Sequence, residues 1–226
     1  DGLDIFVAKY DSSGNFIWVR SAGGTGNSSG GWGDIGYSIS TDTNDNIFIT
    51  GIYWDVATFE DTTTITSYGA GDAFLAKYSN NGNLLWVNGI GGLSGDIGFC
   101  VNTNNNGDVY LGGYHYSDTF INVMNIGDTT FSSIGFVDMF TAKFDSLGNL
   151  VWVVQMGGTD ASGIVLSVVI SDSNEVYITG SFSDTVAFGN FNLNGIQDIY
   201  LAKLNESDCP LPTATFTFSD SLLTVE

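Results

Sequence analysis

Short runs of apolar and β-branched residues alternate with polar, glycine-containing turns along the chain, and no segment shows a helical period. The first two runs span residues 5–10 and 16–21, and the polar turn 11–15 separates them. A short polar loop that contains an Asp, Asn or Ser near its start and a Gly near its end is typical of a β-hairpin. The pattern therefore predicts an all-β protein built from short antiparallel strands.

This hairpin sequence is repeated at intervals of about 60 to 70 residues, which is the length of one propeller blade. In the first three copies a Trp follows the first Phe at a constant interval, and a Gly-Gly pair follows the Trp strand. A second pair of short strands completes each unit, so we count four strands per unit. The four copies begin at Phe6, Phe74, Phe140 and Tyr200.

Four strands per unit, apolar on both faces as in residues 5–8, predict a β-propeller whose blades pack against each other. The chain holds about three four-stranded blades plus one extra strand, whereas closed propellers have about four to eight blades. We therefore expect part of a larger propeller, completed by further blades of a longer chain or by partner chains. The units differ in length only within polar segments, which we expect to be loops. A β-sandwich, or an array of separate domains, is the alternative.

An aspartate, a lysine and a tryptophan recur at fixed positions of the unit. Four of the five basic residues of the chain are these repeat lysines. Each Lys follows its Asp by five positions, and this odd spacing puts the two side chains on opposite faces of one strand. We therefore expect each lysine to form an ion pair or a hydrogen bond with an adjacent blade. A ring of ligand-binding lysines is the alternative. The repeat residues are Asp4, Lys9, Trp18, Asp72, Lys77, Trp86, Asp138, Lys143, Trp152, Asp198 and Lys203.

These motifs resemble the bacterial β-propeller repeat family known as SBBP. The shared pattern is Asp-x-Phe-x-Ala-Lys, a Gly-Asn turn, a Trp strand, a Gly-Gly pair and a Val-Tyr-x-x-Gly strand, and the resemblance extends to about Asn205. It implies a secreted or surface-exposed bacterial protein with no shared catalytic activity. The fourth copy departs from the pattern, because no Trp hairpin follows Lys203.

The departure predicts a domain boundary. We expect propeller repeats over residues 1–205 and a linker at 206–212, which contains both prolines of the chain. Residues 213–226 alternate like a strand and resemble the start of an Ig-like domain of the polycystic-kidney-disease (PKD) type. The chain is then a fragment of a longer protein.

Composition narrows the classes of partner. With 25 acidic and 5 basic residues the formal net charge is −20, which disfavours nucleic acid and anionic membranes as partners. No apolar run reaches the roughly 18 residues of a membrane span. A hydrophobic content of 43% predicts a folded core, and the scarcity of charged residues fits a secreted bacterial surface protein.

One loop offers oxygen ligands at alternating positions, as a Ca²⁺ site does: Asp42, Asn44 and Asn46. It does not fit the EF-hand pattern, because Ile47 stands where Gly is needed and Tyr53 where the bidentate Glu is needed. We therefore prefer an ordinary Asx turn. Ca²⁺ is the one cofactor for which the sequence offers candidate ligands.

Aromatic residues in two loops could stack on the apolar face of a sugar, although packing at the rim of a blade is the preferred interpretation. His115 is the single histidine, so neither a zinc site nor a catalytic triad is indicated. The candidate ligand-binding residues are Trp32, Tyr53, Trp54, Tyr114, His115 and Tyr116.

The two cysteines do not indicate a disulfide. Cys100 occupies a core-strand position and is expected to be a small buried hydrophobe, while Cys209 lies in the linker.

No hydrolase, phosphate-loop or dinucleotide motif is present in the sequence. We therefore expect a non-enzymatic, extracellular or cell-surface propeller module that acts as a scaffold, spacer or adhesin on a protein or glycan. A carbohydrate-active enzyme or glycan-binding propeller, and a self-assembling subunit of an extracellular filament, are the alternatives.

Overall fold

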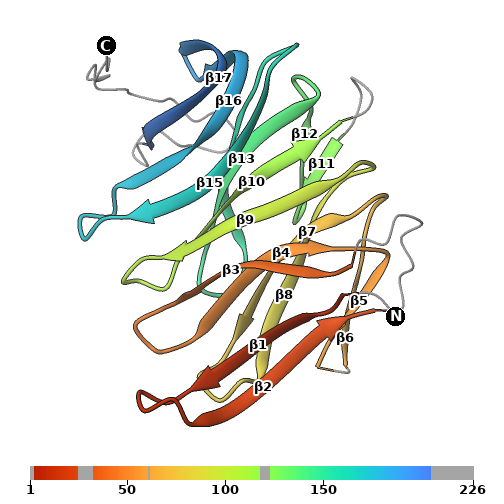
Figure 1. Cartoon of the computed structure of the whole chain (residues 1–226), viewed down its shortest axis with the longest axis vertical. Coiled ribbons are helices and arrows are strands. Elements are labelled where there is room, and N and C mark those ends of the chain that lie inside the picture. Colours follow the sequence, from red (N-terminus) through yellow and green to blue (C-terminus); the bar gives the residue numbers. More distant parts are fainter. Residues whose placement is uncertain (1–2, 25–32, 61, 118–122, 205–226) are drawn as a thin grey trace.

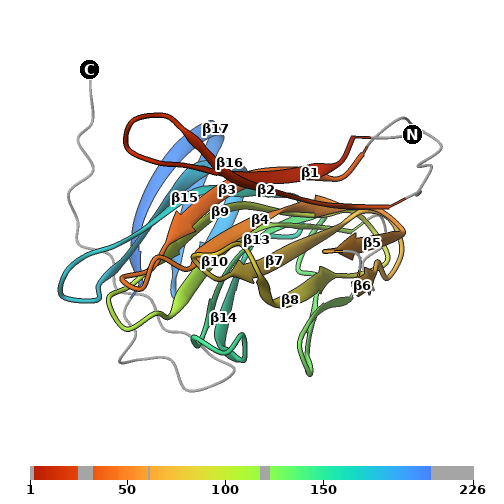
Figure 2. The same cartoon turned by 90° about the horizontal axis from the view of Figure 1, so that it is seen from below.

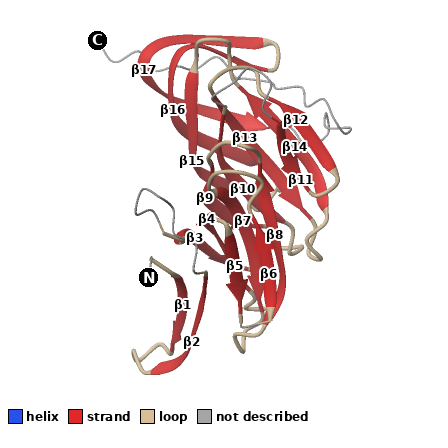
Figure 3. Ribbon diagram, turned by 90° about the vertical axis from the view of Figure 1, so that its right-hand side faces the viewer, coloured by secondary structure: helices blue, strands red, loops and turns tan. Residues whose placement is uncertain are grey.

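The computed structural model describes residues 3–24, 33–60, 62–117 and 123–204, and within these it is entirely β (Figure 3). The predicted linker at 206–212 and the predicted Ig-like segment at 213–226 lie outside the described residues. The strands are β1 (Ile5–Tyr10), β2 (Phe16–Gly23), β3 (Ile35–Thr41), β4 (Ile47–Tyr53), β5 (Val56–Phe59), β6 (Thr63–Thr66), β7 (Asp72–Tyr78), β8 (Leu84–Gly91), β9 (Asp96–Thr103), β10 (Val109–Tyr116), β11 (Val123–Ile126), β12 (Thr129–Ser132), β13 (Val137–Phe144), β14 (Leu150–Met156), β15 (Ser162–Ile170), β16 (Val176–Phe188) and β17 (Phe191–Leu204).

These strands form stacked antiparallel sheets, which we name blades A to D in chain order (Figures 1 and 2). Blade A contains β1, β2, β5 and β6, and blade B has the order β3-β4-β7-β8-β11-β12. Blade C contains β9, β10, β13 and β14, and blade D contains β15 to β17. Blades C and D are linked by one parallel pair, Val137 with Ser162, and by an isolated bridge, Gly157 with Ala187. We treat them as separate blades because the strands of each otherwise pair among themselves. The predicted all-β, propeller-like fold class is confirmed.

The sequence repeat and the blade are offset by two strands. The first strand of the second hairpin motif, β7, pairs with β4 from the preceding repeat, from Ile47 with Tyr78 to Tyr53 with Asp72. Strand β13 pairs with β10 in the same way. Blades B, C and D therefore take strands from two consecutive repeats, whereas the strands of blade A all come from the first repeat.

Part of each segment that the sequence analysis assigned to a loop forms a β-hairpin that joins the preceding blade. Strand β5 pairs with β2 at Ala22 and Phe59, and β11 pairs with β8 at Ile90 and Ile126. In the last repeat, β16 and β17 extend far enough for Ala187 to bridge Gly157, next to β14. Strands β5, β6, β11 and β12 have four residues each, too few to show a clear alternation, and β5 and β11 pair with strands that lie far earlier in the same repeat. A hairpin from the polypeptide segment of one blade thus adds strands to the sheet of the preceding blade.

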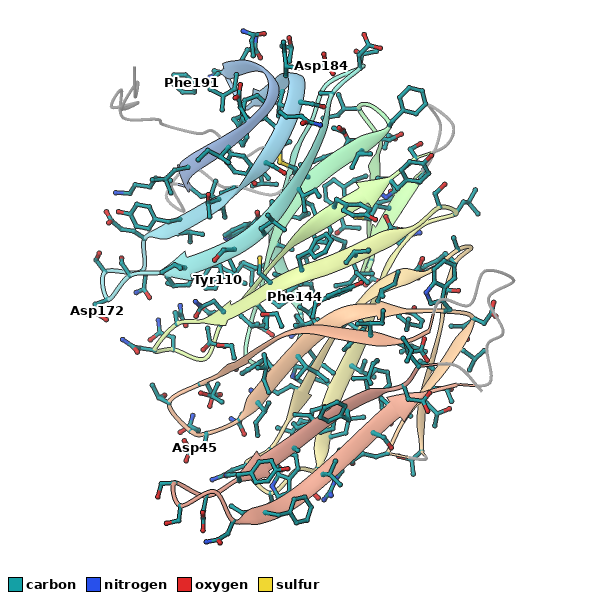
Figure 4. The ribbon with its side chains drawn as sticks, in the orientation of Figure 1. Asp45, Tyr110, Phe144, Asp172, Asp184 and Phe191 are labelled. Carbon is teal, nitrogen blue, oxygen red and sulfur yellow. The ribbon has the colours of Figure 1, made fainter. Side chains whose placement is uncertain are left out.

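The core lies between the blades. On β7, Phe74, Ala76 and Tyr78 belong to the cluster shared with blade A, whereas Ala73 and Leu75 belong to the cluster shared with blade C. This alternation follows from the two-residue period of a strand. Tyr110 and Phe144 both lie in the interior of the stack (Figure 4). Both faces of an internal blade are therefore buried.

We predict that Phe59→Ala lowers the free energy of unfolding by about 3–5 kcal/mol, because Phe59 is fully buried and its ring contacts Phe74 at 5.6 Å. Val56→Ala, on the exposed side of the same short strand, should cost less than about 1 kcal/mol. Urea unfolding measures both values. Equal losses in the free energy of unfolding would show that the β5–β6 hairpin does not contribute to the core.

Candidate functional site

Two rows of polar residues recur at opposite ends of the strands, and together they contain most of the repeat residues. We name the first the blade lock; it consists of a Lys and a Trp in one blade and the hairpin turn of the next blade. In the lock between blades B and C, Lys77 Nζ and Trp86 Nε1 both donate to the carbonyl oxygen of Ser146, at 3.0 and 3.3 Å. A Cβ on Gly148 would lie 2.9 Å from the Trp86 ring, so the turn packs directly on the indole.

The lock between blades A and B has the same geometry. Lys9 Nζ and Trp18 Nε1 donate to the carbonyl oxygen of Asn80 at 3.3 and 3.2 Å, and Lys9 also contacts the Asn80 side chain. A Cβ on Gly82 would lie 2.9 Å from the Trp18 ring. Because Gly82 and Gly148 also have φ of +81° and +88°, both space and backbone conformation require glycine.

A third donor completes both locks. Arg20 Nε donates to the carbonyl oxygen of Gly82, and Asn88 Nδ2 donates to that of Gly148, both at 2.8 Å. Trp152 begins the equivalent lock of blade C, and its buried Nε1 has no hydrogen-bond partner among the described residues.

Three of the lysines also pair with a carboxylate from a turn of their own blade. Lys77 Nζ lies 3.8 Å from Asp42, Lys143 Nζ lies 3.1 Å from Asp108, and Lys203 pairs with Glu175. Burial would raise the pKa of Asp42, but hydrogen bonds within its turn and the charge of Lys77 lower it overall. The lysines thus bind turns of their own blade or of the next blade.

The second row, which we name the carboxylate layer, consists of Asp34, Asp72, Asp96 and Asp138, all buried. Asp72 accepts a hydrogen bond from the backbone N–H of Tyr68, and Asp138 accepts one from that of Ile134. The Gly-Gly pairs provide the space for these carboxylates. A Cβ on Gly91 would lie 2.6 Å from an Asp72 oxygen, and one on Gly157 would lie 1.9 Å from an Asp138 oxygen.

Asp34 and Asp96 were not singled out as site residues from the sequence. Asp34 accepts hydrogen bonds from the N–H groups of Gly24 and Trp54, at 3.0 and 2.8 Å. Asp96 accepts one from the N–H of Gly92 and contacts His115 Nδ1 at 2.5 Å. The available signal was the recurrence of Asp-Ile-Gly followed by an aromatic residue, at positions 34–37 and 96–99.

Burial shifts the acids of this layer. It raises the pKa of Asp72 to about 8, helped by the charge of Asp96. Burial also raises the pKa of Asp34, Asp96 and Asp138, against hydrogen bonds that lower it. A carboxyl group in an aqueous cleft could act as a general acid, but these four are at most 5% exposed, so a solvent-borne substrate has no access to them. The layer ties backbone segments together.

The terminal copies of the repeat aspartate differ from the internal ones. Asp4 and Asp198 are both exposed, whereas Asp72 and Asp138 are fully buried. A repeat position therefore becomes part of the layer only where a neighbouring blade covers it.

The proposed Ca²⁺ ligands form an Asx turn. Asp42 accepts hydrogen bonds from the N–H groups of Asn44 and Asn46, both at 2.9 Å, and from Asn46 Nδ2 at 2.8 Å. Asp145 makes the same three bonds in its own turn. Asp45 and Asp172 mark two turns at this edge of the stack (Figure 4). In the described part of the chain, no group of three or more His, Cys, Asp and Glu side chains is placed to hold a metal ion.

The aromatic candidates lie at the ends of β4 and β10. Tyr53 and His115 are buried, with 0% and 1% exposure, and Trp54 and Tyr114 are half-buried. Tyr116 is 40% exposed. The structure therefore leaves little open ring surface for a sugar at these positions. Trp32 lies outside the described residues.

Cys100 is buried with a free thiol, and burial raises its pKa to about 12, which makes the thiolate inaccessible at neutral pH. Cys209 lies outside the described residues. No helix in the described ranges is long and apolar enough to cross a membrane.

Comparison with known proteins agrees with a repeat propeller-like fold. No protein-family model matches the chain. An uncharacterized WD repeat-containing protein of Acanthamoeba polyphaga mimivirus is 25% identical over 213 residues, covering 84% of this chain and 15% of that protein. The regulatory protein FlaEY of Caulobacter vibrioides is 25% identical over 179 residues, covering 76% of this chain and 18% of that protein. The chain spans less than a fifth of the length of these curated relatives.

We predict that Lys77→Met lowers the free energy of unfolding by about 3–5 kcal/mol, because it leaves the buried Asp42 without its cation. Lys203→Met is the matched control. The side chains of Lys203 and Glu175 are 43% and 39% exposed, so Lys203→Met should destabilise the protein far less than Lys77→Met. Urea unfolding compares them, and similar losses would contradict a buried role for Lys77.

We predict that Asp72→Asn gains stability relative to the wild type as the pH rises. The folded protein holds the Asp72 proton up to about pH 8, whereas the unfolded chain releases it near the ordinary value of 3.8. Wild-type stability should therefore fall between about pH 4 and pH 8, and the asparagine variant should lack the part of this loss that comes from Asp72.

Urea unfolding at several pH values checks this expectation. Asp145→Asn is the control, since hydrogen bonds within its turn outweigh burial and lower the pKa of Asp145. Its effect on stability should therefore be constant above about pH 5. An Asp72→Asn effect that is equally constant would show that the buried acid is ionised.

Proposed function

We propose that this chain is a non-enzymatic propeller module that serves as a scaffold for protein partners. The observation that carries the proposal is that the repeated charged residues are used in architecture. The repeat lysines join turns and blades, and the acids of the carboxylate layer are closed to solvent. A repeat protein whose described charged repeat residues are used in its architecture acts through its surface.

The names of the two relatives support this class. One is a WD repeat-containing protein and the other a regulatory protein, and neither name states an enzymatic activity. WD repeats are propeller blades.

Within this class we propose an SBBP-type repeat protein that is extracellular or displayed on a bacterial cell surface, as a spacer or adhesin. A net charge of −20 and the scarcity of lysine outside the repeat motif support an exposed, soluble surface. The PKD-type segment at 213–226 would be the start of the next extracellular domain. We propose no resident cofactor, because the carboxylate of Asp42 is occupied by its own turn and by Lys77.

We predict no turnover when the purified chain is screened against polysaccharides and chromogenic glycosides, and no binding on a glycan array. We also predict that antibodies against the chain label intact, unpermeabilised cells of the organism that encodes it. Turnover of any glycoside would refute the non-enzymatic role, and glycan binding alone would favour the glycan-binding alternative. Labelling only after permeabilisation would refute the surface location while leaving the scaffold role standing.

A further inference from the structure

The two ends of the blade stack expose apolar positions that are buried inside it. At the first end, Phe6 is 73% exposed, whereas its equivalents Phe74 and Phe140 are fully buried. Tyr10 is 58% exposed, whereas its equivalent Tyr78 is 1% exposed. We define the N-face as Phe6, Ala8 and Tyr10 of β1 together with Val19 of β2, which is 49% exposed, whereas its equivalent Val153 is buried.

The hairpin turn beside the N-face is also open. Gly14 is the equivalent of Gly82 and Gly148, each of which packs on the tryptophan of the preceding blade. Around the Cβ position of Gly14 there is no atom within 4 Å. The turn at 11–15 therefore presents the acceptor side of a blade lock with nothing packed on it.

At the opposite end, β17 exposes the complementary side (Figures 1 and 3). Ile199 and Leu201 are 86% and 73% exposed, although their equivalents in β7, Ala73 and Leu75, are fully buried. The side chain of Lys203, the equivalent of Lys77, is 43% exposed. We define the C-face as Ile199, Leu201 and Lys203.

The interface between blades B and C shows what these positions do when they are covered. Ala73 and Leu75 share a core cluster with Phe140 and Ala142, and Lys77 donates to the carbonyl oxygen of Ser146. The equivalents of Ala73, Leu75 and Lys77 form the C-face. The equivalents of Phe140, Ala142 and Ser146 are Phe6 and Ala8 on the N-face and Ser12 beside it. One molecule thus carries both halves of this interface.

We propose that the C-face of one copy docks on the N-face of a second copy, head to tail, and so continues the blade stack. Ile199 and Leu201 would cover Phe6 and Ala8, and Lys203 would donate to the carbonyl oxygen of Ser12. Blade D has no Trp strand among the described residues, so the tryptophan contact of the internal locks is not reproduced. This inference goes beyond the proposed scaffold role and is independent of the scaffold's ligand.

Because the two faces differ, the contact is heterologous, and it either closes into a ring or extends into a filament. Blades A to D of two copies amount to about eight, which is within the range of closed propellers. A ring of two copies is therefore the assembly that the geometry favours. An open filament is the other outcome of the same contact.

Sedimentation velocity of the 226-residue chain over a range of concentrations tests the proposal. Phe6→Asp damages only the N-face and Leu201→Asp only the C-face, and both positions are too exposed to be needed for folding. We expect the wild type to associate and each variant alone to be weakened at least about tenfold. An equimolar mixture of the two variants should form dimers, because one intact C-face still meets one intact N-face.

Leu147→Asp is the control, since Leu147 is 74% exposed in a turn outside both faces, and it should associate like the wild type. Circular dichroism verifies the fold, and Val19→Asp replaces Phe6→Asp if that variant misfolds. A monomeric wild type at every concentration would overturn the proposal, and so would a mixture that stays monomeric. Association lost in Phe6→Asp but kept in Leu201→Asp would instead indicate contact between two N-faces. None of these results bears on the glycoside screen or on cell labelling.

Discussion

Contact between successive blades is the constraint on which the rest of this structure depends. An internal blade such as β3-β4-β7-β8 is apolar on both faces, so it is stable only when neighbours remove both faces from water. The free energy of folding is therefore distributed along the stack and does not reside in any single sheet. Each feature of the repeat can be understood as a means of keeping consecutive blades in contact and in register.

Polar residues at the two ends of the strands determine that register. At one end, Lys77 and Trp86 reach the same carbonyl oxygen of the next blade. At the other end, the buried Asp34, directly before β3 of blade B, accepts a hydrogen bond from the N–H of Gly24, directly after β2 of blade A. Apolar contact alone is non-directional and would tolerate sliding of one blade over the next. Hydrogen bonds to single atoms at both ends do not tolerate it.

The positions of the charged residues also bear on function. A chain with five basic residues has used them for contacts between strands, turns and blades, and its buried acids are shielded from solvent. What remains outside is a strongly acidic surface with loops and two apolar end faces. Such a surface can bind partners and can extend the stack, and these are the activities that we assign to it.

Several features could be predicted from the sequence. The all-β class, the hairpin turns and the recurrence of lysine and tryptophan follow from periodicity and turn chemistry, which act within about twenty residues. The hairpins β5–β6 and β11–β12 could not be predicted, because their strands are short and pair with strands of the preceding blade that lie far away in the sequence. The pairing of Asp96 with His115 was missed too, since the two residues meet across strands β9 and β10.

The amino-acid sequence by itself determined where strands and turns form, because these depend on local side-chain alternation and on glycine and Asx residues at fixed positions. Only the tertiary structure decided which atoms the repeated residues meet. Lys77 lies 69 positions from the carbonyl oxygen of Ser146, and the two-strand offset between repeat and blade brings them together. That offset comes from pairing between β4 and β7, a contact between repeats that no local pattern specifies.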